Sequence, residues 1–127
     1  MNGYVGKIED KTMKNKYFRD VLFTAKNMQL VVMSLLPLED IGMEVHKKVD
    51  QFFRIESGEG KVLMNGKASK VKAGDAFIVP METEHNVINT SKTQALKLYT
   101  IYTPPNHRDK IIHKTKKAAM ADKTDHV

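Results

Sequence analysis

Short apolar runs separated by turn residues dominate the pattern along this chain. In residues 51–56 the side chains alternate, so that Gln51, Phe53 and Ile55 share one face of an extended strand. Asn65-Gly66 is the strongest two-residue hairpin signal in the sequence. The pattern predicts strands over residues 17–23, 28–36, 41–46, 51–56, 61–64, 68–71, 76–79, 83–89 and 95–102.

The segment 28–36 is different, because its apolar run is nearly unbroken. It has no polar alternation from Leu30 to Leu36 apart from Ser34, which indicates a strand covered on both faces. Its centre is β-branched and Pro37 follows directly, and both features argue against a helix.

Many short strands with turns every few residues predict an all-β sandwich or barrel. The sequence predicts one domain over residues 1–127, with a barrel at 28–102. Residues 1–16 are polar and rich in lysine, and we expect an N-terminal arm with a short strand at 4–8. Pro104-Pro105 ends the sheet, and residues 104–127 form a C-terminal tail with a short helix at 115–123, capped by Thr115.

Composition narrows the functional classes. The absence of cysteine excludes disulfides and thiolate metal sites. No apolar run approaches the length of a membrane span, and the first residues do not resemble a signal peptide, so we expect a cytoplasmic protein with no membrane partner. The formal charge is +6, but the lysines are scattered and only three arginines are present. The scatter argues against a nucleic-acid partner, and a small anionic substrate suits the positive charge as well as a nucleic acid would.

Four polar residues in the strand region are candidate ligands of a divalent metal ion. Glu44 and His46 are two residues apart and therefore share a strand face, and Gln51 opens the next strand. His85 begins a later strand that would approach from across the barrel. Such a mixed set of nitrogen and oxygen donors suits zinc, manganese or iron. The donor types do not distinguish among these three metals. The alternative is a barrel without metal, in which these residues form hydrogen bonds.

The spacing of these residues resembles the motifs of the cupin superfamily, in particular small single-domain barrels of the cupin_2 type. The second cupin motif is matched in spacing by Gly74, Pro80, Glu82, His85 and Asn89. Gln51 and Gly58 occupy the end of the first motif, and counting back places His46 and Glu44 on the two remaining ligand positions. Glu82 stands where the motif has glycine. A positive φ would cost a glutamate on the order of 1 kcal/mol, so we expect a locally different turn there.

The resemblance implies a double-stranded β-helix, or jelly-roll barrel, with metal ligands Glu44, His46, Gln51 and His85. In the family's usual pattern a histidine stands at the position of Glu44 and a glutamate at the position of Gln51. This chain departs from the pattern at both positions. Residues 50–54 and 104–107 resemble small cupins described as mannose-6-phosphate isomerase-like. This implies a metal-dependent enzyme acting on a small polar or sugar-like substrate. A metal-dependent dioxygenase and a non-enzymatic ligand-binding cupin are the alternatives, and small cupins commonly form homodimers.

His107 is the candidate catalytic residue. It follows the Pro104-Pro105 stop, which fixes where its side chain points, and imidazole can act as general acid or base near neutral pH. His107 and His113 would then belong to a lid over the mouth of the barrel. The alternative is that both are surface histidines on a tail.

Overall fold

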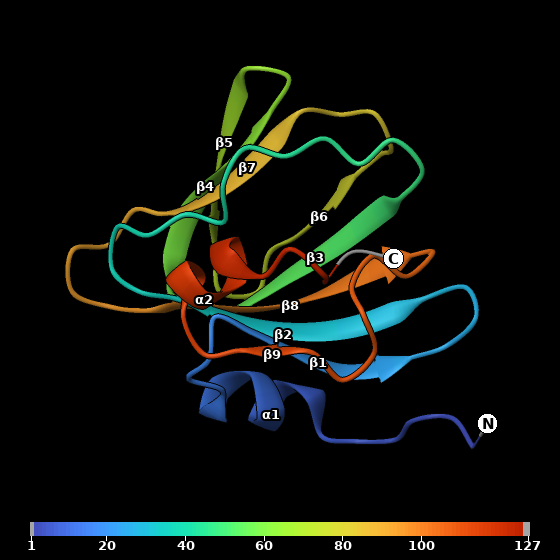
Figure 1. The fold of residues 1–127 in the computed structure, drawn as a ribbon. Coiled ribbons are helices and arrows are strands. Elements are labelled where there is room, and N and C mark those ends of the chain that lie inside the picture. Colours follow the sequence, from blue (N-terminus) through green and yellow to red (C-terminus); the bar gives the residue numbers. More distant parts are fainter. Residues whose placement is uncertain (1, 126–127) are drawn as a thin grey trace.

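The computed structural model describes residues 2–125 and shows two β-sheets packed face to face, with a helix near each end of the chain (Figure 1). The larger sheet has the strand order β6-β3-β8-β2-β1-β9 and the smaller one the order β5-β4-β7. The strands are β1 Arg19–Thr24, β2 Gln29–Leu35, β3 Asp50–Ser57, β4 Glu59–Met64, β5 Lys67–Lys72, β6 Ala76–Val79, β7 His85–Asn89, β8 Leu96–Thr103 and β9 Ile112–His113. The predicted all-β jelly roll is confirmed.

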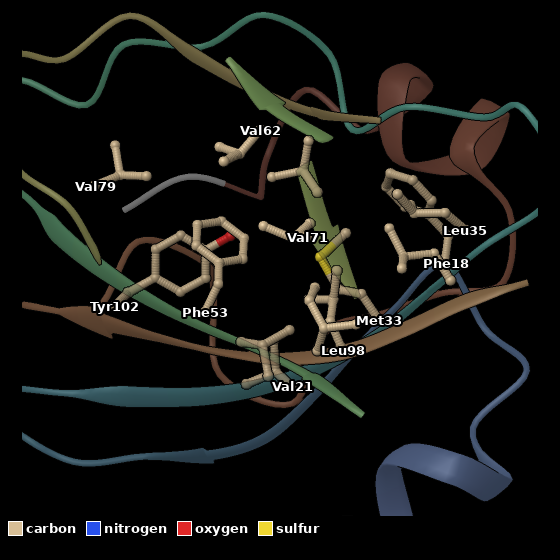
Figure 2. Close-up of a cluster of buried hydrophobic side chains, with 14 of the residues drawn as sticks. Phe18, Val21, Met33, Leu35, Phe53, Val62, Val71, Val79, Leu98 and Tyr102 are labelled. Atoms are coloured by element: carbon tan, nitrogen blue, oxygen red, sulfur yellow. The ribbon is translucent and has the colours of Figure 1, made fainter. Parts of the chain in front are cut away.

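The core lies between the two sheets. Phe53, Met33 and Leu98 project from the larger sheet toward Val62 and Val71 of the smaller one (Figure 2). The alternation predicted for β3 is confirmed, because Gln51, Phe53 and Ile55 are its buried side chains. Burial of these apolar side chains contributes about 25 cal/mol for each Å² removed from water, which holds the sheets together.

Strand β2 is buried on both faces, as its unbroken apolar run predicted. Val31 and Met33 face the core, whereas Val32 and Ser34 are buried on the opposite face. That outer face is covered by helix α1, Ile8–Lys14, which packs against β2, β3 and β8 (Figure 1). A helix here supplies the second cover that such a strand requires.

The expected strand at residues 4–8 is therefore wrong, and the N-terminal segment contains a helix instead. Acidic residues occupy the first turn of α1 and lysines its last turn, which matches the helix dipole. Asp10 and Lys14 form an ion pair one turn apart. The buried hydroxyl of Thr12 donates to the carbonyl of Ile8 at 2.7 Å. The order of charged residues along this segment thus favours a helix over a loosely held arm.

The C-terminal segment is part of the fold. Helix α2, Lys116–Ala121, begins after Thr115, whose side chain accepts from the backbone N–H of Ala118, so the predicted cap is confirmed. Before it, β9 pairs with β1 at the edge of the larger sheet. His107 and His113 are both buried, which overturns the alternative that they are surface histidines on a tail. Neither helix in residues 2–125 is long and apolar enough to cross a membrane.

The turn before β7 has the conformation that the cupin motif requires. Glu82 has φ = 67°, so the expectation of a locally different turn is wrong. Its backbone N–H donates to the carbonyl of His46 at 2.7 Å. The left-handed conformation is stabilised because it aims this donor at the segment that carries two of the candidate ligands.

Replacing Glu82 by glycine is expected to stabilise the protein by up to about 1 kcal/mol, since glycine adopts a positive φ without the steric cost that a Cβ imposes. Urea unfolding measures the difference. The matched control is Glu84→Gly, because Glu84 is not among the residues with positive φ and glycine there only adds flexibility to the unfolded chain. A loss of stability in Glu82→Gly equal to that in Glu84→Gly would contradict the strain at this turn.

Candidate metal centre

Glu44 and His85 are held side by side by their backbones. Residues 41–46 do not form the predicted strand, and Gly42, with φ = 111°, lies in this irregular segment. Glu44 nevertheless forms a single β-bridge with His85, in which each N–H donates to the other's carbonyl at 2.9 Å. The two residues of such a pair carry their side chains on the same face, so the bridge brings the acid to the imidazole.

His46 lies next to these two residues. Its ring centroid is 5.3 Å from that of His85. Its Nε2 atom lies 3.0 Å from Oε2 of Glu44, but Nε2 is buried and has no partner with the geometry of a hydrogen bond. A buried imidazole nitrogen without a hydrogen bond is costly, and this one is aimed at the carboxylate of a second candidate ligand.

Gln51 is oriented by a chain of hydrogen bonds on the strand that it opens. Its Nε2 donates to Oγ1 of Thr100 at 2.9 Å, and that hydroxyl donates in turn to the carbonyl of Phe52 at 2.8 Å. The amide oxygen Oε1 is buried and has no hydrogen-bond partner. Because the amide nitrogen is fixed on Thr100, the oxygen is the atom left to face a ligand.

His85 is held in one tautomer. Its Nδ1 lies 2.9 Å from the carbonyl oxygen of Thr83, and a carbonyl can only accept. Nδ1 therefore carries the proton, and Nε2 of the neutral ring keeps its lone pair. A backbone acceptor behind an imidazole is the usual support of a metal-ligating histidine.

Glu44 is ionised at neutral pH. Burial is the largest single influence and raises the pKa of its carboxyl group. The contact with His46 and the charge of Arg19 act in the opposite direction and outweigh burial, so the pKa of Glu44 lies below its ordinary value. The site therefore offers one negative charge to a cation.

The donor types of the four candidate residues suit a divalent metal ion, but the structure does not arrange them around one point. In residues 2–125, no three His, Cys, Asp or Glu side chains are clustered as they are around a bound ion. The candidate set contains three such residues and an amide, and it carries two buried donor atoms without hydrogen bonds, Nε2 of His46 and Oε1 of Gln51. Glu44, Gln51 and His85 line one narrow cavity inside the barrel.

His107 does not line this cavity and lies behind a tyrosine that does. Its Nδ1 is 2.6 Å from Oδ2 of Asp125, and its Nε2 is 3.0 Å from the hydroxyl of Tyr102. Since the carboxylate accepts from Nδ1, Nε2 of the neutral ring accepts from the tyrosine. Burial raises the pKa of Tyr102 above its usual range, which keeps the phenol protonated.

Three further residues of this region, Arg19, Asp122 and Asp125, carried no signal in the sequence. Arg19, at the start of β1, donates from Nη1 to Nδ1 of His113 at 3.1 Å. The Nε2–H of that histidine donates to Oδ2 of Asp122 at 3.0 Å. The same Nη1 atom of Arg19 lies 3.9 Å from Asp125. The two contacts of Arg19 join residues about a hundred positions apart, and no local motif in the sequence predicts them.

Comparison with known proteins identifies the family of this fold. A model of the cupin domain matches residues 31–102. The crystal structure of BH2720 from Bacillus halodurans is 42% identical to this chain, covers 94% of both chains and superposes with a TM-score of 0.91. The jelly roll predicted from the motif spacing is thus the fold of a solved relative.

Two curated relatives extend the comparison. YrkC of Bacillus subtilis is 47% identical over 125 residues, which are 93% of this chain and 66% of YrkC. L612 of Acanthamoeba polyphaga mimivirus is 44% identical over 108 residues, which are 82% of this chain and 67% of L612. This chain therefore spans about two thirds of the length of both relatives, which are described as uncharacterized. By the matched domain and these relatives, the chain belongs to the cupin family.

Proposed function

We propose that this cupin binds one divalent metal ion through Glu44, His46, Gln51 and His85, and acts as an enzyme on a small polar or sugar-like substrate. The observation that carries the proposal is that two buried atoms of this set, Nε2 of His46 and Oε1 of Gln51, lack a partner in hydrogen-bond geometry, although Nε2 lies 3.0 Å from the carboxylate of Glu44. Native proteins rarely leave such atoms unsatisfied, and a metal ion would satisfy both.

The donor set supports zinc, manganese or iron, because two imidazoles, one carboxylate and one amide oxygen are borderline ligands. A bound ion of this kind would supply a Lewis acid that polarises a substrate oxygen. Only one ligand is charged, so the loaded site would keep a net positive charge and favour an anionic or enediolate group.

The protein's own residues supply proton chemistry beside this site. Tyr102 lines the same cavity as Glu44, Gln51 and His85, and its phenol oxygen, whose proton is donated to His107, can accept a hydrogen bond from a substrate hydroxyl. His107 holds the phenol from behind and is itself held by Asp125. We therefore propose that His107 acts through Tyr102 as a positioning residue, in an isomerase-like reaction that moves a proton.

Metal analysis of the purified protein tests the proposal. We expect about one zinc, manganese or iron ion per chain after purification without chelators, since four protein ligands suffice to retain it. Mass spectrometry of the digested protein measures the content. Only trace metal, together with no rise in melting temperature when each of the three ions is added back, would overturn the proposed site.

The identity of the metal also separates the proposed reactions. Iron together with substrate-dependent oxygen uptake would favour a dioxygenase, whose iron must admit both substrate and oxygen. Zinc or manganese would favour the isomerase-like reaction. Tight binding of a small ligand without turnover would favour a binding module.

A further inference from the structure

A second cavity, of about 420 Å³, lies directly outside the candidate metal centre. It shares Glu44 and His46 with that centre and is closed on its other side by α2 and the end of the described chain. Its remaining lining residues include Phe18, Arg19, Met120 and Asp125. A substrate in this cavity would therefore lie beside Arg19 as well as Glu44 and His46.

The guanidinium group of Arg19 is buried but only partly paired. Its side chain is 7% exposed, and its contacts with His113 and Asp125 both involve Nη1. Its Nε atom is buried and has no hydrogen-bond partner among the described residues. Guanidinium carries five N–H donors in a planar fork, and at least the Nε donor stays unused, while the group also lies over the ring of Phe18, 5.2 Å from its centroid. Burial of an incompletely paired charge is costly, which indicates that another group completes it.

The charges around the cavity favour an anion as that group. Asp125 lies 3.9 Å from Arg19 and shares its carboxylate with His107 and the backbone N–H of Arg108. With a divalent metal bound, the charges of the ion and of Arg19 together exceed those of Glu44 and Asp125. A carboxylate or phosphate matches the guanidinium fork, which binds such groups through paired hydrogen bonds.

We propose that Arg19 is the specificity-determining residue of the site and anchors a carboxylate or phosphate group of the substrate in the outer cavity. The inference rests on the proposed metal-dependent function and assigns its substrate class, a small anion rather than a neutral sugar. It also gives a role to the buried arginine that begins strand β1.

Paired probes that differ in charge test the assignment. The metal-loaded protein is titrated by calorimetry with glycerol 3-phosphate against glycerol, and with acetate against acetamide. We expect heat of binding from the anions alone. In Arg19→Gln the affinity for both anions is expected to fall by about 10- to 100-fold, because charged hydrogen bonds are lost. Arg19→Lys keeps the charge but not the fork, and we expect an intermediate loss.

Two controls make the result decisive. Lys26→Gln removes the same charge from the exposed turn after β1, at the opposite end of that strand from Arg19, and should leave anion affinity unchanged. Metal content is measured in every variant, so that loss of anion binding with metal retained is assigned to Arg19. Equal binding of charged and neutral probes, or undiminished anion binding in both Arg19 variants, would overturn the proposal. If Arg19→Gln does not fold, Arg19→Lys carries the comparison.

Discussion

A variant in which both His46 and His85 are replaced by alanine is expected to lose its metal while keeping its fold. The two imidazoles are the nitrogen donors of the proposed set, and only Glu44 and Gln51 would remain. Loss of a residue that only supports a metal ligand weakens metal affinity about 10- to 100-fold. Removal of two ligands should therefore weaken metal affinity by more than about 100-fold. Mass spectrometry of the digested protein measures the metal, and circular dichroism measures the fold.

The fold should survive because of how the two side chains are held. Nε2 of His46 has only its 3.0 Å contact with Glu44, so its removal breaks no hydrogen bond to the backbone. The bridge between Glu44 and His85 runs through backbone atoms and persists in alanine. His113→Ala is the matched control, since it removes a buried histidine that bonds Arg19 and Asp122 rather than a proposed ligand. Metal content at the wild-type level in the double variant would contradict the ligand assignment.

Most of the barrel was predictable because its signals are local. Alternation marked β3, and Asn65-Gly66 marked the β4–β5 hairpin, where both residues have positive φ. The grouping of Glu44, His46, Gln51 and His85 was predictable from motif spacing, although the segment 41–46 is irregular. In that segment a single backbone bridge to His85, rather than the predicted strand, positions Glu44.

The surroundings of the site were not predictable, because distant segments create them. Nothing near Arg19 in the sequence indicates that His113 and Asp125 will meet it, and β9 is only two residues long. His107 was singled out for its position after two prolines, yet its neighbours are Tyr102 and Asp125 rather than solvent. Helix α1 was missed for the opposite reason, since only two of its seven residues are apolar and they show little periodicity.

Asp125 connects the end of the described chain to the barrel. Its side chain is 2% exposed and accepts from His107 at 2.6 Å and from the backbone N–H of Arg108 at 3.1 Å. It also lies within ion-pair distance of Arg19. One carboxylate thus balances a buried cation, orients the imidazole behind Tyr102 and fixes the C-terminal segment over the outer cavity.

Replacing Asp125 by alanine is expected to lower the free energy of unfolding by about 3 kcal/mol, because breaking a buried ion pair leaves the charge of Arg19 uncompensated. Asp125→Asn keeps an oxygen that can accept from His107 and should lose less. Asp109→Ala is the matched control, since Asp109 is exposed in the same segment and such changes cost within about 0.5 kcal/mol. Urea unfolding at neutral pH compares the three. If Asp125→Ala were no less stable than Asp109→Ala, the C-terminal segment would not be held by this carboxylate, and the outer cavity would lack its fixed wall.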